Sequence, residues 1–292
     1  MYKVGFIGLG RMGSGICNNI IKNGHDTVVF DTNPEAYRNI EERMHAAKDV
    51  SEVFSLCEIT FLSLPGSIQV EETIGKFMEC GVEGKTVIDL STSYPISSRK
   101  IYELFKNNGG YFADSSLSGS PNDSANGNLL VFFGGDKEVY DRWLPLMRTF
   151  SREVKYVGAS GSGNIAKLAC NYLGVMYATL YAEIFPLLEK LGVDINQFYD
   201  IIGSTKVDCG VYRFYAPKIV NKTYDMGFSL ELALKDITYV KRMFEEYEVP
   251  AFILEGGLNL LRTSVKDGKA NKDLSECAAT VRDYLKILGG MQ

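Results

Sequence analysis

The most constraining feature of the sequence is a glycine-rich turn placed directly between a strand pattern and a helix pattern. Val4-Gly-Phe-Ile-Gly8 is a short apolar run, Gly8-Leu-Gly10-Arg-Met-Gly13 follows at once, and residues 12–22 have helical apolar spacing. Residues 27–30 form the next strand pattern, which ends in Asp31. Glycines in such a turn let a pyrophosphate approach the backbone, and the helix N-terminus supplies N–H donors. This context predicts a dinucleotide-binding turn.

The acid at the end of the second strand indicates which dinucleotide is bound. Asp31 would accept hydrogen bonds from the ribose hydroxyls and would repel a 2′-phosphate, which favours NAD. The expected cofactor contacts of the turn itself are Gly8, Leu9, Gly10, Arg11, Met12 and Gly13.

Strand and helix patterns continue to alternate up to about residue 156. Further apolar strand runs cover 59–64, 86–89, 111–114, 129–133 and 153–156, with helix patterns at 95–107 and 137–147. This alternation predicts an α/β domain with a doubly wound, Rossmann-type, mostly parallel sheet. Ligands of such sheets bind beyond the carboxyl ends of the strands. Asp31, Leu64-Pro65, Ser91-Thr92 and residues 115–120 fall at these ends.

The rest of the chain has only helix patterns. A long helix is expected from Gly163 toward Gly192, with a kink or break near Pro186, because proline removes a backbone donor and crowds the preceding turn. Later helices are expected at 194–202, 228–247, from Pro250 onward, and from Asp273 to about residue 288. We therefore expect a dinucleotide-binding domain over 1–160 and an all-helical substrate and oligomerisation domain over 161–292.

The start of the long helix carries candidate catalytic residues. Lys167 and Asn171 lie one turn apart, so both side chains project from one face. A lysine can act as an acid–base group where burial disfavours its charged form. His25 and His45 both fall in short connections, so neither is placed for catalysis. The alternative interpretation is a solvated lysine and asparagine on an amphipathic helix.

Composition excludes several classes of function. A net charge of −5 provides no basic surface for nucleic acid, and no run of 18 apolar residues predicts a membrane span. The first residues enter a strand pattern at once, which predicts no signal peptide. The six cysteines are scattered without a C-x-x-C pair, and no metal-ligand spacing occurs. We expect a cytoplasmic protein without a metal and without nucleic-acid or membrane partners.

Four motifs in order resemble the β-hydroxyacid dehydrogenase family, which includes 3-hydroxyisobutyrate dehydrogenase and tartronate semialdehyde reductase. The resemblance covers essentially the whole chain. The motifs are Gly5-Phe-Ile-Gly-Leu-Gly-Arg-Met-Gly13, Asp114-Ser-Ser-Leu-Ser118-Gly119-Ser120, Gly161-Ser-Gly163 with Lys167 and Asn171, and Phe228 with Lys235-Asp236.

The resemblance implies hydride transfer between NAD(H) and a small β-hydroxy acid or semialdehyde carboxylate. Lys167 would be the acid–base residue, and Asn171 would hold the substrate hydroxyl. The substrate would contact Ser118, Gly119, Ser120 and Thr92, and further cofactor contacts would come from Leu64, Pro65, Thr92, Phe228 and Lys235. By the same resemblance, the helical domains would pair, giving a homodimer or homotetramer.

The chain departs from the family pattern near the expected substrate. The family usually has Ala-Pro-Val before its Ser-Gly-Gly, whereas this chain has Ser115-Ser116-Leu117 and then Ser120-Pro121. The loop from Lys206 through Arg213, which the resemblance implies would face the site, also has a sequence of its own in this chain. Substrate identity therefore stays open. Without the other motifs, Ser118-Gly119-Ser120 would be an ordinary small-residue loop.

Two other functions stay open as alternatives. A decarboxylating enzyme like 6-phosphogluconate dehydrogenase would carry a histidine before the asparagine and a glutamate after it, where this chain has Cys170 and Gly174. A catalytically silent NAD-binding module would be expected to lose the reactive lysine, which is present here. An imine reductase is disfavoured for the same reason, since those relatives usually replace that lysine.

Overall fold

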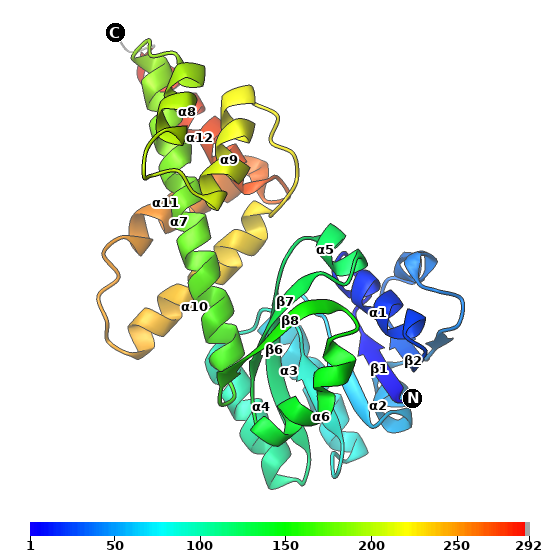
Figure 1. The fold of residues 1–292 in the computed structure, drawn as a ribbon. Helices are drawn as coiled ribbons and strands as arrows, with labels where there is room; N and C mark the ends of the chain where they lie inside the picture. The colour runs from blue at the N-terminus through cyan, green and yellow to red at the C-terminus, as the bar shows by residue number, and fades with distance from the viewer. Residues whose placement is uncertain (290–292) are drawn as a thin grey trace. The chain divides into compact units, whose positions relative to one another are not determined.

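The computed structural model describes residues 1–289, and the chain folds as two compact units (Figure 1). The first unit spans Met1–Lys167, and the second begins at Leu168. The division falls inside helix α7 (Ser162–Lys190), shortly after the boundary expected at residue 160.

The first unit is built on one eight-stranded sheet of order β3-β2-β1-β4-β5-β6-β7-β8. Neighbouring strands in this described sheet run parallel except for the pair β6–β7. The doubly wound, mostly parallel sheet predicted from the sequence is confirmed. The strands are β1 (Lys3–Ile7), β2 (Asp26–Phe30), β3 (His45–Ala46), β4 (Ile59–Leu62), β5 (Thr86–Asp89), β6 (Tyr111–Ser118), β7 (Leu129–Gly134) and β8 (Ser151–Gly158).

Helices cover both faces of this sheet (Figure 1). One apolar core joins the strands to α1 and α6, through side chains such as Ile16 and Trp143. A second core joins them to α2, α3 and α4, through side chains such as Phe77 and Phe105. The helices of this unit are α1 (Gly13–Lys22), α2 (Val50–Leu56), α3 (Ser67–Cys80), α4 (Pro95–Asn107), α5 (Pro121–Ala125) and α6 (Lys137–Met147), with a 3-10 helix over Pro34–Asn39.

The second unit is helical throughout its described residues, around a single apolar core that includes Phe185, Tyr212 and Leu258. Its helices after α7 are α8 (Ile195–Gly203), α9 (Gly210–Asn221), α10 (Leu230–Glu246), α11 (Leu254–Ser264) and α12 (Cys277–Gly289), with a π-helical turn over Val265–Lys269 and a 3-10 turn over Leu274–Glu276. None of the described helices has the length and apolarity to cross a bilayer.

Side-chain caps set several helix starts in this unit. Asp194 accepts the backbone N–H groups of Asn196 and Gln197 at the start of α8, as expected. Ser229 caps α10, so that helix begins after Phe228 rather than at it. Asp273 caps the short 3-10 turn that precedes α12 instead of α12 itself.

Of the kink or break expected near Pro186, a break does not occur. Helix α7 runs through this proline as one element from Ser162 to Lys190. An interior proline removes one backbone donor and its ring crowds the preceding turn, which together cost about 3 kcal/mol or more. Phe185 and Ala182, in the turn before the proline, are fully buried in the helical core, and burying a phenylalanine alone contributes about 1.5–3 kcal/mol. Core packing of the turn before the proline therefore offsets much of this cost.

Candidate active site

The glycine turn after β1 has the shape that a dinucleotide requires. Gly8 has a φ of +96°, and a Cβ there would overlap the carbonyl oxygen of Ser63. A Cβ on Gly13 would overlap the carbonyl oxygen of Gly8. Gly10 differs, because a Cβ there would meet no described atom within 4 Å. Gly8 and Gly13 are thus required by the close packing of the turn, whereas Gly10 leaves space beside the turn for a ligand.

Asp31 lies directly against this turn. Its carboxylate accepts the N–H of Leu9 at 2.6 Å and the N–H of Asn33 at 2.7 Å. Each carboxylate oxygen can accept a further hydrogen bond, so capacity for ribose hydroxyls remains. Helix α1 starts at Gly13 without a side-chain cap among the described residues, and although the N–H of Ser14 donates to the carbonyl oxygen of Gly10, the positive end of the helix dipole faces this turn and favours an anion there. These residues fit a dinucleotide.

Two further expected contacts meet at the ends of β4 and β5. The N–H of Leu64 donates to the hydroxyl of Ser91 at 2.8 Å, which brings the Leu64-Pro65 segment next to the loop that carries Thr92. Ser91 in turn donates its N–H to the buried Asp89 at 2.9 Å. The structure therefore brings these three predicted contacts together at the carboxyl edge of the sheet.

Ser120 has a structural task that the sequence analysis did not assign. It forms a capping box with Asp123 at the start of α5, in which the serine N–H and hydroxyl donate to Asp123 Oδ2 at 2.7 and 2.6 Å. These bonds lower the pKa of Asp123. Gly119, at φ +143°, lies beside Leu129. The segment expected to form the substrate-binding loop is strand β6 up to Ser118, with Gly119 directly after it, and the hydroxyl of Ser120 is bonded to Asp123.

The start of α7 is fixed to the sheet by a buried carboxylate. Asp114 on β6 accepts the backbone N–H of Gly161 at 2.5 Å and that of Asn164 at 2.8 Å. Burial raises the pKa of Asp114 to about 6. A Cβ on Gly163 would overlap the carbonyl oxygens of Phe132 and Asp114, so the helix start lies directly on β6 and β7. Lys167 follows one turn later on this firmly held helix.

In the second unit, Asn171 and Lys235 meet around one buried carboxylate. The amide Nδ2 of Asn171 donates to Asp236 Oδ2 at 2.7 Å, and the Lys235 ammonium lies 3.3 Å from Asp236 Oδ1. Asp236 is only 3% exposed. The sequence analysis named Asp236 within a motif but gave it no role. The contact fixes the orientation of the Asn171 amide, which is what a substrate-holding group needs.

Phe228 is held by its backbone just before α10. Its N–H donates to Asp273 Oδ2 at 3.1 Å, and its carbonyl oxygen accepts the N–H of Leu274 at 2.8 Å. The same Asp273 oxygen accepts the N–H of Gly227 at 2.8 Å. Asp273 was expected only to cap a helix, and it additionally positions the segment that carries Phe228.

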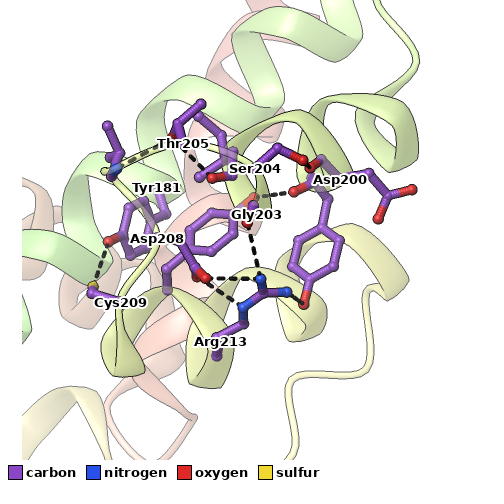
Figure 2. Close-up of polar contacts among 12 residues, drawn as sticks. Tyr181, Asp200, Gly203, Ser204, Thr205, Asp208, Cys209 and Arg213 are labelled. Atoms are coloured by element: carbon purple, nitrogen blue, oxygen red, sulfur yellow. Dashed lines mark hydrogen bonds and ion pairs between the residues drawn. The ribbon is translucent and has the colours of Figure 1, made fainter.

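Residues 206–213, expected as a loop, form the turn before α9 and the first turn of that helix, and they hold a polar cluster (Figure 2). Arg213 pairs with both carboxylate oxygens of Asp208 at 2.8 Å and stacks over Tyr199. The thiol of Cys209 lies 3.7 Å from the hydroxyl of Tyr181, and hydrogen bonding to backbone N–H, chiefly that of Tyr212, lowers the thiol pKa. Asp208 therefore neutralises the charge of Arg213 within this cluster.

Among residues 1–289, no group of three or more His, Cys, Asp or Glu side chains could hold a metal ion. The buried carboxylates accept hydrogen bonds from protein groups. Asp89 accepts from the hydroxyl of Ser93, and Asp114 and Asp236 accept from the N–H groups of Gly161 and Asn171.

Comparisons with known proteins agree with this arrangement. A family profile described as the NAD binding domain of 6-phosphogluconate dehydrogenase matches residues 3–158, more than half of the chain. A second, described as NAD-binding of NADP-dependent 3-hydroxyisobutyrate dehydrogenase, matches residues 161–281.

Individual relatives cover nearly all of the chain. The chain is 26% identical to 2-hydroxy-3-oxopropionate reductase of Escherichia coli K12, over 80% of this chain and 82% of that protein. It is 27% identical to 3-sulfolactaldehyde reductase of the same organism, over 97% and 96%. The fold superposes on Mycobacterium tuberculosis 3-hydroxyisobutyrate dehydrogenase, solved with L-serine, with a TM-score of 0.89, 23% identity and coverage of 97% and 99%. The chain therefore belongs to the β-hydroxyacid dehydrogenase family of oxidoreductases that use a nicotinamide dinucleotide.

Proposed function

We propose that the chain transfers a hydride between NAD(H) and a small β-hydroxy acid or the corresponding semialdehyde carboxylate, with Lys167 as the acid–base residue. The observation that carries this proposal is the pairing on α7 of Lys167 with Asn171, whose amide is oriented by Asp236. Relatives of the chain are named as reductases of hydroxy-oxo acids, sulfolactaldehyde and semialdehydes, all small and anionic.

Each residue has a defined part in this reaction. Bound NAD supplies the hydride acceptor for oxidation, and the NADH that forms supplies the donor for reduction. Lys167 accepts the hydroxyl proton as the C–H hydride leaves, and it returns the proton to the oxygen in the reverse direction. Asn171 hydrogen-bonds the same substrate oxygen without adding charge. Ser118 and Gly119 bind the substrate carboxylate.

We propose NAD rather than NADP as the cofactor. Asp31 is held at the glycine turn by Leu9, where the 2′-phosphate of NADP would meet a like charge. No arginine directly follows Asp31, and Arg38, the next one along the chain, is paired with Glu35 at 2.5 Å. We expect kcat/KM to favour NADH at least tenfold, a difference of about 1.4 kcal/mol.

The cofactor assignment has a direct test. kcat/KM is measured with NADH and NADPH on the same aldehyde for the wild type and for Asp31→Asn, which keeps the size of the side chain and removes its charge. The substitution should lower the ratio of kcat/KM with NADH to kcat/KM with NADPH. Equal values for the two cofactors in the wild type, or a preference for NADPH, would overturn the NAD assignment.

We further propose that the active protein is a homodimer or homotetramer assembled through α7. Six apolar side chains, between 38% and 68% exposed, repeat at intervals of three and four residues along the outside of this helix and at the residue directly after its end. A continuous apolar helical face is self-complementary across a two-fold axis. The residues are Leu173, Tyr177, Leu180, Ile184, Leu187 and Leu191.

Light scattering on the purified protein tests this assembly. We expect a dimer or tetramer for the wild type and a smaller species for Leu180→Glu, because a charge would be buried in the contact. Leu232→Glu on α10, which is 42% exposed and outside this face, serves as the control and should leave the mass unchanged. A monomeric wild type would refute the proposal.

A substrate panel tests the proposed reaction. Succinic semialdehyde, 2-hydroxy-3-oxopropionate and 3-hydroxyisobutyrate are assayed by following NADH absorbance. We expect turnover of at least one of these small carboxylates. Tight NADH binding without turnover of any related β-hydroxy acid or semialdehyde would point instead to a silent binding module.

A further inference from the structure

Ser116 on β6 lies where three segments of the first unit meet. Its hydroxyl donates to Asn164 Oδ1 at 2.6 Å and lies 3.2 Å from the carbonyl oxygen of Ser91. The side chain is completely buried. The single proton of the hydroxyl, donated to Asn164, bonds β6 to the first turn of α7. The loop that follows β5 is bonded to the same Asn164 oxygen through the N–H of Ser93. By the resemblance described above, proline, which has no hydroxyl, would be usual at this position, whereas this chain has Ser116.

Asn164 completes the junction. Its Oδ1 also accepts the N–H of Ser93 at 2.9 Å, and its Nδ2 donates to the hydroxyl of Ser98 on α4 at 3.0 Å. Asn164 is completely buried, and its backbone N–H is bound to Asp114. The amide therefore has partners on both of its ends, which fixes it in one orientation.

This junction bears on both halves of the proposed chemistry. Asn164 lies three residues before Lys167, on the same side of α7. Ser91 and Ser93 flank Thr92, which is an expected contact of both cofactor and substrate. A group that holds Asn164 and the Ser91–Ser93 loop together therefore sets the position of the Lys167 amine relative to Thr92.

We propose that Ser116 is a positioning residue, whose hydroxyl fixes the first turn of α7 and the Ser91–Ser93 loop so that Lys167 is held in its reactive place. The inference rests on the proposed role of Lys167. Removing the hydroxyl leaves the buried oxygen of Asn164 with one donor fewer, and the turn is then free to shift. Small misplacements of reacting groups cost up to about 10²-fold in rate, so we expect Ser116→Ala to lower kcat roughly tenfold.

The neighbouring residue offers a matched control. Ser115 is on the same strand and equally buried, but its hydroxyl has no hydrogen-bond partner among the described residues. Ser115→Ala removes the same atom without removing a hydrogen bond. Ser116→Cys nearly retains the volume with a weaker donor, and its activity should fall between that of the wild type and that of Ser116→Ala.

The experiment measures kcat and KM with succinic semialdehyde and NADH, or with 2-hydroxy-3-oxopropionate if that is the panel member turned over. It also measures the Kd of NADH by fluorescence and the hydrogen exchange of the amides at 161–167. For Ser116→Ala we expect a roughly tenfold lower kcat, a Kd within about twofold of the wild type, and faster exchange. Ser115→Ala should change none of these quantities. Combined with Lys167→Ala, Ser116→Ala should have little further effect.

The outcomes separate this inference from the proposed function. If Lys167→Ala is inactive and Ser116→Ala matches Ser115→Ala in both kcat and exchange, the positioning role of Ser116 is wrong and the proposed function stands. The positioning role is also wrong if Ser116→Ala lowers kcat by the same factor in the Lys167→Ala background as in the wild type. If Lys167→Ala turns over near the wild-type rate, the proposed function fails and this inference fails with it.

Discussion

The two faces of strand β6 carry adjacent serines with opposite surroundings. On one face, Ala113 and Leu117 pack in the apolar core beneath α1 and α6, and Ser115 between them makes no described hydrogen bond through its hydroxyl. On the other face, Asp114 and Ser116 bind the first turn of α7. Two neighbouring residues of the same type therefore make very different contributions to the structure.

The difference shows how this fold combines stability with placement of the site. The apolar face supplies burial, which is non-directional and tolerates changes that keep volume. The polar face supplies directed hydrogen bonds, which set where α7 starts and how it is oriented. Burying carboxylates on that face costs free energy, and the raised pKa values of Asp89 and Asp114, both about 6, reflect that cost.

The largest expected effect is a loss of stability when the start of α7 is pushed away from the polar face of β6. Gly163→Ala would place a Cβ on the carbonyl oxygens of Phe132 and Asp114, neither of which can move freely. We expect a loss of about 3 kcal/mol or more in the free energy of unfolding, measured by urea denaturation. Gly174→Ala, on the same helix with no described atom within 4 Å of the new Cβ, should be neutral or stabilising. Equal effects of the two substitutions would show that α7 does not depend on this contact.

A smaller effect should appear as a pH dependence on the polar face. Burial, with the charge of Asp114 as a lesser cause, raises the pKa of Asp89 from 3.8 to about 6, so the folded state holds an extra proton between these values. The resulting stability is fully present below about pH 4 and is lost as the pH rises through about 6.

Asp89→Asn tests this sign, since it keeps the shape and cannot titrate. The stability of the wild type minus that of the variant should fall, by on the order of 1–3 kcal/mol, between about pH 4.5 and pH 7.5. Asp114, which pairs with Asp89 in the β5–β6 register, titrates in the same range, so the variant should keep part of the dependence. A difference that stays constant or rises with pH would contradict the burial argument.

The smallest effect is expected on the apolar face. Ser115→Ala removes a buried hydroxyl without a described partner, and it restores the residue usual in the family at this position. We expect thermal unfolding to show a gain of about 1 kcal/mol, because an unsatisfied polar group no longer has to be desolvated. A loss of stability would mean that the Ser115 hydroxyl has a partner in solution, and the contrast between the two faces would weaken.

Local patterns made most of the fold predictable. The strand, glycine turn and helix around Gly8 are contiguous in sequence, and so are the alternating strands that follow. The contacts that organise the site are not contiguous: Asp114 reaches Gly161 across 47 positions, and Ser116 reaches Asn164 across 48. No periodicity or motif indicates such pairs. The motif included Asp236 next to Lys235, but its hydrogen bond to Asn171 joins residues 65 positions apart and could not be predicted from the motif.

The expectation at Pro186 was wrong in part. A local rule predicted a kink or break there, and the break does not occur, because packing of Phe185 and Ala182 in the core helps to keep the helix continuous. The capping role of Ser120 had a local signal that could have been used, since Ser-x-x-Asp before a short helix is typical of a capping box.

The most direct test of the account is the turnover of Lys167→Ala, with Lys190→Ala in the last turn of the same helix as the control. NADH binding, followed by fluorescence, should stay within about twofold of the wild type in both variants, because neither lysine is assigned to the cofactor. The account predicts that Lys167→Ala loses on the order of 10²–10⁴ in kcat and that Lys190→Ala loses almost nothing. Turnover by Lys167→Ala within a few-fold of the wild type from about pH 6 to pH 10 would contradict it.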